Sequence, residues 1–91
     1  MEQPYRPAAL AASAQQTAQE EAKISALTAC ERQVITLVGA GLRDPQIARL
    51  LGISAPTVRQ HLSAIFGKLG VIGRLELILY AYRHGLAKIP A

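Results

Sequence analysis

The sequence predicts an all-α fold, a four-helix helix-turn-helix domain that follows a flexible or partly helical N-terminal linker. Three observations lead to this prediction. Apolar residues recur at spacings of three and four along the last two thirds of the 91 residues. Residues that cap helices precede these segments, and glycines follow them. Two of the marked helix starts lie about ten residues apart, which leaves room for little except two helices joined by a tight turn.

The first segment, residues 1–24, is rich in alanine, glutamine and serine. From Ala8 to Ala22 the helix propensity is good, but no large apolar stripe is present, so a helix here is marginal without a partner. We therefore expect a linker at 1–24, disordered or marginally helical. The domain itself should span 25–87, with a short tail at 88–91.

The first helix of the domain begins at a capping box. Thr28 and Glu31 have the spacing at which each side chain accepts a hydrogen bond from a backbone N–H of the other residue. Its apolar side consists of Val34, Ile35, Leu37 and Val38. We interpret this helix as scaffold, with contact between Arg32 and a phosphate as the alternative.

The helix-turn-helix is predicted at residues 44–63. Asp44 is expected to cap the first short helix, whose first turn accommodates Pro45. Gly52 can adopt a positive φ and end this helix. Ala48 has almost no side chain, so the next helix can approach closely.

The second helix of this pair should run from Ala55 to about Lys68, with Ser54 as its N-cap. Its apolar stripe consists of Val58, Leu62, Ile65, Phe66 and Leu69. Arg59, Gln60 and Ser63 share the opposite face, and all three side chains can hydrogen-bond to base edges in DNA. The alternative is that they are ordinary solvated residues on an exposed helix face.

The last helix, residues 75–84, is apolar on two sides. One stripe, expected to face the core, consists of Leu75, Ile78, Leu79 and Tyr82. The second side consists of Leu77, Tyr80, Ala81 and His84. A small domain has little protein to cover both sides, so we expect this second side to form a homodimer interface. The alternative is a few scattered exposed apolar residues, as on any surface.

Charge is unevenly distributed along the chain. From Ser25 onward eight Lys/Arg and three Asp/Glu give +5, whereas residues 1–24 carry −1. A basic domain suits a polyanion, although a pI near 9.7 is equally common in proteins that never meet DNA.

The sequence favours neither a metal site nor an enzyme. Cys30 is the only cysteine, which excludes an intrachain disulfide and a cysteine-based metal cluster, and we expect it to be a partly buried structural thiol and not a redox sensor. His61 and His84 are too few for a ligand set, and His61 should lie beside the DNA backbone or pack at the helix edge. Paired carboxylates, an activated nucleophile and a phosphate-binding glycine loop are lacking, so we expect no cofactor and no catalysis. Without a membrane span or signal peptide, a cytoplasmic location is expected.

From Ser25 to Ala87 the sequence resembles the LuxR/FixJ-type DNA-binding domain, in register and without gaps. The residues that carry the resemblance are Leu27, Thr28, Glu31, Val34, Leu37, Gly41, Ile47, Ala48, Leu51, Gly52, Ile53, Ser54, Thr57, Val58, His61, Ile65, Lys68, Leu69, Gly70, Val71, Arg74, Glu76, Leu77, Gly85 and Leu86. The resemblance implies a four-helix domain whose third helix enters the major groove and whose fourth forms the dimer contact. It also implies transcriptional control in a bacterium.

The hypothesis that the second helix of the pair enters the major groove assigns roles that we state as expectations. Arg59, Gln60 and Ser63 should read bases. The expected phosphate ligands are Gln46, Ser54, Thr57 and Lys68. Asp44, Pro45 and Gly67 depart from the family pattern at positions that are commonly polar or basic, which predicts weaker anchoring to the DNA backbone.

We therefore expect the chain to bind an inverted-repeat operator in double-stranded DNA as a homodimer, as the output domain of a response regulator in a two-component system. An upstream receiver or sensor domain would then be missing, and the chain would be a fragment; a naturally short stand-alone regulator is the alternative. The competing functional hypothesis is a protein-interaction module on the same scaffold that contacts a regulator or a polymerase subunit.

Overall fold

The computed structural model describes the backbone of residues 7–87 and the side chains of residues 16–87. Its helices are α1 (Pro7–Ser25), α2 (Ala29–Gly39), α3 (Asp44–Leu51), α4 (Ala55–Leu69) and α5 (Arg74–Arg83). The described part contains no strand, so the predicted all-α class is confirmed. The four expected helices are α2 to α5, and α1 lies in the expected linker. The predicted tail, 88–91, and linker residues 1–6 lie outside the described residues.

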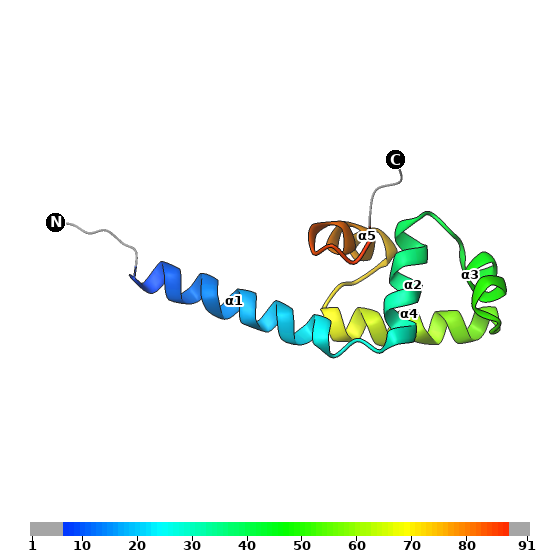
Figure 1. Cartoon of the computed structure of the whole chain (residues 1–91), viewed down its shortest axis with the longest axis horizontal. Helices are drawn as coiled ribbons and strands as arrows, with labels where there is room; N and C mark the ends of the chain where they lie inside the picture. Colours follow the sequence, from blue (N-terminus) through cyan, green and yellow to red (C-terminus); the bar gives the residue numbers. More distant parts are fainter. Residues whose placement is uncertain (1–6, 88–91) are drawn as a thin grey trace.

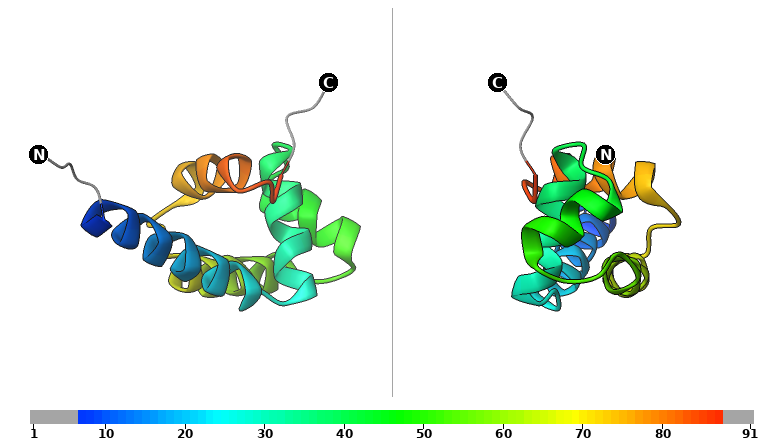
Figure 2. Two further views of the ribbon diagram at one scale, coloured as in Figure 1. Left: turned by 60° about the vertical axis from the view of Figure 1, so that its left-hand side comes forward. Right: turned by 90° about the vertical axis from the view of Figure 1, so that its right-hand side faces the viewer.

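Helices α2 to α5 form a small bundle in which α2 contacts each of the other three. In Figure 1, α2 crosses α4, and α3 lies near the end of α4 that is remote from α1. Helix α5 packs mainly against α2. Helix α1 extends away from the bundle, so the longest dimension of the molecule is 61 Å (Figures 1 and 2).

The core gathers one face from each helix of the bundle. Its largest fully buried side chains are Ile35, Ile47, Ile65, Leu69, Leu77, Val34, Val38 and Val58. The predicted apolar sides of α2 and α4 therefore face inward, with Leu37 and Phe66 packed at the edge and only half-buried. Ala48 is buried as well, which agrees with the close approach expected between α3 and α4.

Two of the predicted helix ends are confirmed. The Thr28 N–H donates to Glu31 Oε1 at 2.8 Å, and the Glu31 N–H donates to Thr28 Oγ1 at 3.1 Å, which completes the capping box of α2. Gly52 ends α3 with φ of 70°. This left-handed conformation is one that glycine adopts without a steric penalty.

The start of α3 differs from the prediction by one residue. Arg43 is the N-cap, Asp44 is the first helical residue, and the Arg43 N–H donates to Gln46 Oε1 at 2.8 Å. The Asp44 carboxylate instead accepts from the Arg74 guanidinium at 2.9 Å. The cap predicted at Asp44 is therefore wrong, because this side chain joins α3 to α5.

The orientation predicted for α5 is wrong in part, because Ile78 and Tyr82 pack against the core as expected but Leu75 and Leu79 do not. Leu77 and Ala81 are completely buried, whereas Leu75 is 71% and Leu79 52% exposed. Both sets of residues have helical spacing, so the sequence pattern alone could not distinguish them.

Three hydrogen bonds are consistent with the observed rotation of α5. At its start the Arg74 guanidinium donates to Asp44 and to the Leu42 carbonyl. Near its end the Tyr82 hydroxyl donates to the Gly39 carbonyl. Because side chains at both ends of α5 bind neighbouring elements, they help to fix the rotation of the helix about its own axis.

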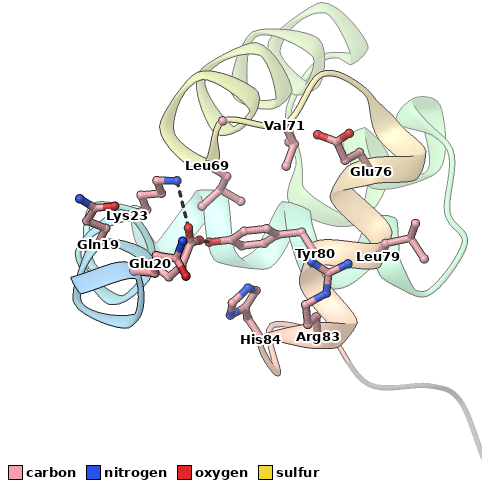
Figure 3. A pocket seen from close by; sticks show the side chains of 12 residues that line it. Gln19, Glu20, Lys23, Leu69, Val71, Glu76, Leu79, Tyr80, Arg83 and His84 are labelled. Carbon is pink, nitrogen blue, oxygen red and sulfur yellow. Dashed lines mark hydrogen bonds and ion pairs between the residues drawn. The ribbon is translucent and has the colours of Figure 1, made fainter. Parts of the chain in front are cut away.

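Helix α1 was expected to be marginal without a partner, and in the structure it packs against α4 and α5. The Tyr80 hydroxyl of α5 donates to Glu20 Oε1 at 2.5 Å, and Lys23 pairs with the other Glu20 oxygen at 3.1 Å. Figure 3 shows Glu20, Lys23 and Tyr80 pointing toward one another. Ile24 packs against the core cluster. The C-terminal half of α1 is therefore docked on the domain. Of the described helices, none combines the length and hydropathy needed to cross a membrane.

Candidate nucleic-acid interface

The outer face of α4 carries the three predicted base-reading residues. Arg59, Gln60 and Ser63 are all exposed. The opposite face is buried against α2 and α3 through Val58 and Ile65, which have no exposed surface. The predicted division of this helix into a core side and a solvent side is confirmed.

Hydroxyl groups gather at the start of α4. The Thr57 N–H donates to Ser54 Oγ at 3.2 Å, and the two hydroxyl oxygens lie 2.8 Å apart. Ser54 is exposed and Thr57 half-buried. A helix N-terminus carries partial positive charge and free N–H groups, so this end of α4 favours an anion such as a phosphate.

Helix α3 presents a second polar surface beside α4. Ile47 and Ala48 are buried under the turn, and Gln46 and Arg49 are exposed on the outer side. Gln46 was predicted as a phosphate ligand, and its carboxamide oxygen already caps the start of α3. Arg49 was missed. Its helical position opposite Ile47 and Ala48 could have indicated that it is a free cation on the same surface.

Lys68 was predicted to bind a phosphate, but its side chain binds groups within the domain. Its Nζ is 2.7 Å from Glu31 Oε1 and donates to the Ala26 carbonyl at 3.0 Å. The Glu31 carboxylate is 95% buried, and a buried carboxylate is stable only with such a partner. The ammonium group is therefore occupied inside the domain, which argues against the phosphate contact expected for Lys68.

The environment of Glu31 explains the strength of this contact. Burial raises the pKa of its carboxyl, but hydrogen bonds from Lys68 and the Thr28 backbone outweigh burial and hold the pKa below its usual value of 4.5. Glu31 is therefore charged at neutral pH. The pair fixes the C-terminal end of α4 to the start of α2.

Two further residues lie on the outer face of α4 beyond those predicted to read bases. Ala64 and Gly67 are exposed, and a Cβ added to Gly67 would have no atom within 4 Å. Both are small and cannot hydrogen-bond through a side chain, so a pattern of polar side chains does not include them. Helical periodicity from Gln60 and Ser63 could have placed them on this face.

Comparison with known proteins gives this arrangement a family. The family model of bacterial regulatory proteins, luxR family, matches residues 25–81. The chain belongs to the LuxR family. This is a family of DNA-binding transcription regulators and not of enzymes. Among solved structures, the transcription factor GerE matches with a TM-score of 0.63 and 39% identity, over 68% of this chain and 92% of that chain.

Curated relatives of this LuxR-family chain carry similar descriptions. The monoamine regulon transcriptional regulator of Klebsiella aerogenes is 46% identical over 66% of this chain and 27% of its own length. A putative HTH-type transcriptional regulator of Mycobacterium bovis is 42% identical over 65% of this chain and 7% of its own length. The response regulator protein VraR of Staphylococcus aureus is 35% identical over 66% of this chain and 29% of its own length. The match thus spans less than a third of each of these relatives.

The residues predicted for a dimer interface do not form a surface in this LuxR-family domain. Leu77, Tyr80 and Ala81 are buried in the core, and His84 is half-buried with its ring centroid 4.2 Å from that of Tyr80. The interface predicted on that side of α5 is therefore wrong, because the chain's own helices cover it. Exposed apolar side chains lie instead at Ile72, Leu75 and Leu79, which we call the outer α5 patch.

Cys30 and His61 meet between α2 and α4 of the LuxR-family domain. The Cys30 Sγ lies 3.6 Å from His61 Nε2, and both residues are half-buried. His61 thus packs at the edge of α4, one of the two positions expected for it. Cys30 is the partly buried thiol that its place in the helix predicted.

Proposed function

We propose that this chain is the DNA-reading output domain of a bacterial transcription regulator and inserts α4 into the major groove of double-stranded DNA. The observation that carries the proposal is the outer face of α4, where Arg59, Gln60 and Ser63 project from a helix anchored on its other side. A major groove accepts one α-helix, and an exposed polar face on a rigid helix suits base readout.

The chemistry of each side chain suggests its partner. The Arg59 guanidinium suits guanine O6 and N7, and the Gln60 carboxamide suits adenine N6 and N7. Ser63, with a hydroxyl that donates and accepts, suits either kind of polar base edge. These three side chains would determine the polar part of the sequence preference.

Phosphate contacts would come from both sides of the turn. Ser54 and Thr57 stand at the positive end of α4, and Gln46 stands on the exposed side of α3. Arg49 replaces Lys68 in this set, because it is exposed whereas Lys68 is held by Glu31. Such contacts orient the domain on DNA without reading its sequence.

We place the homodimer contact on the outer α5 patch. Its three side chains are 89%, 71% and 52% exposed, at Ile72, Leu75 and Leu79 respectively. Two-fold dimers are the commonest oligomers, and a second copy would cover this apolar surface. Two half-sites about one helical turn apart would then be read by the two copies of α4.

In the cell, an upstream receiver domain would control this output. One matched relative is described as a response regulator, and the matched region is under a third of its length. Helix α1 precedes the domain and would connect it to such a domain. A regulator of this kind would act in the cytoplasm, where the bacterial chromosome lies.

Selection of bound sequences from random double-stranded DNA tests the proposal. An enriched inverted repeat, with affinity that falls steeply as salt rises, is the expected outcome. No enrichment at low salt would overturn it. In that case the second candidate, a protein-interaction module, would be favoured, since Leu50 of α3 is 65% exposed beside the same surface.

A further inference from the structure

Ala64 is exposed and lies close to the centre of the outer face of α4. Each residue of an α-helix turns by about 100°, so Ala64 lies about 40° from Gln60 around the helix axis. The buried stripe of Val58, Leu62, Ile65 and Leu69 centres almost directly opposite Gln60. By the same count Arg59 lies about 100° from Gln60. Ala64 therefore projects more directly outward than Arg59.

The side chain of Ala64 has one chemical property to offer, an exposed methyl group. Among the base edges of the major groove, only thymine presents an apolar group, its C5-methyl. The neighbouring Gln60 and Ser63 are polar and suit the polar edges. Gly67, one turn further along, adds no side chain and therefore does not keep the methyl of Ala64 away from a base.

We infer that Ala64 is a specificity-determining residue that contacts the C5-methyl of a thymine in each half-site, next to the base pair read by Gln60. This inference rests on the proposed function, because it requires α4 to lie in the major groove. It concerns one base position that the polar side chains leave unread. The competing explanation is that Ala64 is only a good helix former at a surface position.

The experiment replaces each thymine of the selected operator, one at a time, by deoxyuridine, which lacks only the C5-methyl. Affinities of the wild-type protein and of Ala64→Gly are measured on every duplex. For the wild type we expect about fourfold weaker binding at one thymine in each half-site, as for the loss of one buried methyl group. For Ala64→Gly the same replacement should change affinity by less than the measurement error, while replacement of other thymines affects both proteins equally.

Comparison within each protein removes any general effect of the glycine on α4. Thermal unfolding shows whether Ala64→Gly folds. If it does not, Ala64→Ser is used instead, because it has nearly the same volume and carries a hydroxyl on the Cβ, which makes the surface facing the thymine methyl polar. Loss of methyl sensitivity in either variant supports the inference. Methyl sensitivity that persists in the variant, or a wild type insensitive at every thymine, overturns the inference but leaves the operator and the proposed function standing. Failure to enrich any operator overturns both.

Discussion

Gly39 occupies the last turn of α2, where the C-terminal part of the chain crosses it. A Cβ added at this position would overlap the Cβ of Ala87. Gly67 lies in the last turn of α4, and a Cβ added there would have no atom within 4 Å. A side chain therefore has no room at Gly39 but has room at Gly67, and neither glycine has a positive φ.

We predict opposite effects of alanine at these two positions. Gly39→Ala should destabilise the domain by about 1–3 kcal/mol, because the added methyl forces backbone or Ala87 to move. Gly67→Ala should stabilise it by up to about 1 kcal/mol, because alanine is the better helix former and meets no neighbour. Urea unfolding of both variants measures the difference. Equal effects would show that the packing at Gly39 is not as tight as described.

Arg59 and Arg49 allow base reading to be separated from backbone anchoring. Arg59→Ala should weaken binding to the selected operator by about 1–3 kcal/mol and relax the preference at one base position, because a bidentate guanine contact is lost. Arg49→Ala should weaken binding to all sequences alike and reduce the slope of log affinity against log salt by about one. Binding curves on operator and random duplexes at several salt concentrations distinguish the two. If both variants behave identically, the assigned roles are wrong.

At the scale of elements, one ion pair joins α4 to α2. Lys68 is near the end of α4 and Glu31 in the first turn of α2, and only the carboxylate is deeply buried. Position 68 carries a cation on the polar margin of the helix, so its sequence context favours a role on DNA. The tertiary structure assigns it to Glu31 instead, because a buried charge needs a partner.

The main effect of Lys68→Ala should therefore be a lower free energy of unfolding and not a direct loss of DNA affinity. We expect a loss of about 2–3 kcal/mol, since the Glu31 carboxylate is left buried without its partner. Lys68→Ala, Glu31→Gln in one chain should recover part of the loss, because the amide carries no charge. Urea unfolding at neutral pH measures both variants. A wild-type stability in Lys68→Ala would contradict this assignment.

The same pair predicts an acid-sensitive step in stability. The pKa of Glu31 in the folded state lies below its ordinary value of 4.5, so the unfolded chain binds its proton first as pH falls. The contribution of the pair is complete above about pH 4.5 and declines as pH falls through the lowered pKa. Unfolding free energies between neutral pH and pH 3 should show a shallower decline for Lys68→Ala than for the wild type.

Helix α5 provides a matched test of the proposed dimer. Leu79→Asp should leave the domain folded but prevent cooperative binding to the inverted repeat, because it places a charge in the outer α5 patch. Leu77→Asp, two residues away, should unfold the domain, because Leu77 is completely buried. Circular dichroism and sedimentation on DNA distinguish these outcomes. A Leu79→Asp protein that still binds as a dimer would exclude this patch.

At the scale of the whole molecule, α1 is an additional helix that packs against the four-helix domain. Helix α1 contacts α4, and the Tyr80 hydroxyl of α5 donates a hydrogen bond to Glu20 of α1. The Tyr80 hydroxyl and Lys23 both hydrogen-bond the Glu20 carboxylate and lower its pKa. An upstream domain connected through α1 would therefore be joined to the domain beside α5.

Tyr80→Phe should weaken the attachment of α1 to the domain and leave the packing of the other helices unchanged. Hydrogen exchange should become faster in the second half of α1, because the hydroxyl that binds Glu20 is absent, while the ring still fills the core. Tyr82→Phe serves as the control, since the Tyr82 hydroxyl binds the Gly39 carbonyl in α2 and not α1. Unchanged protection of α1 in Tyr80→Phe would show that apolar packing alone holds it.

The sequence by itself determined the class of the fold, the start of α2, the bounds of α4 within a few residues, the capping box and the left-handed glycine at 52. These features depend on neighbours within one or two helical turns, so local spacing is sufficient to predict them. It also determined which face of α4 is exposed, because that helix has a single apolar stripe.

The tertiary structure alone decided the features that depend on contacts distant in sequence. Helix α5 has two apolar sides, and its packing on α2 together with hydrogen bonds to Leu42, Asp44 and Gly39 distinguishes the inner from the outer one. Lys68 finds Glu31 across 37 positions, and Tyr80 finds Glu20 across 60. Helix periodicity gives the direction of a side chain around its own axis, but a partner on another helix is set by the packing of the whole chain.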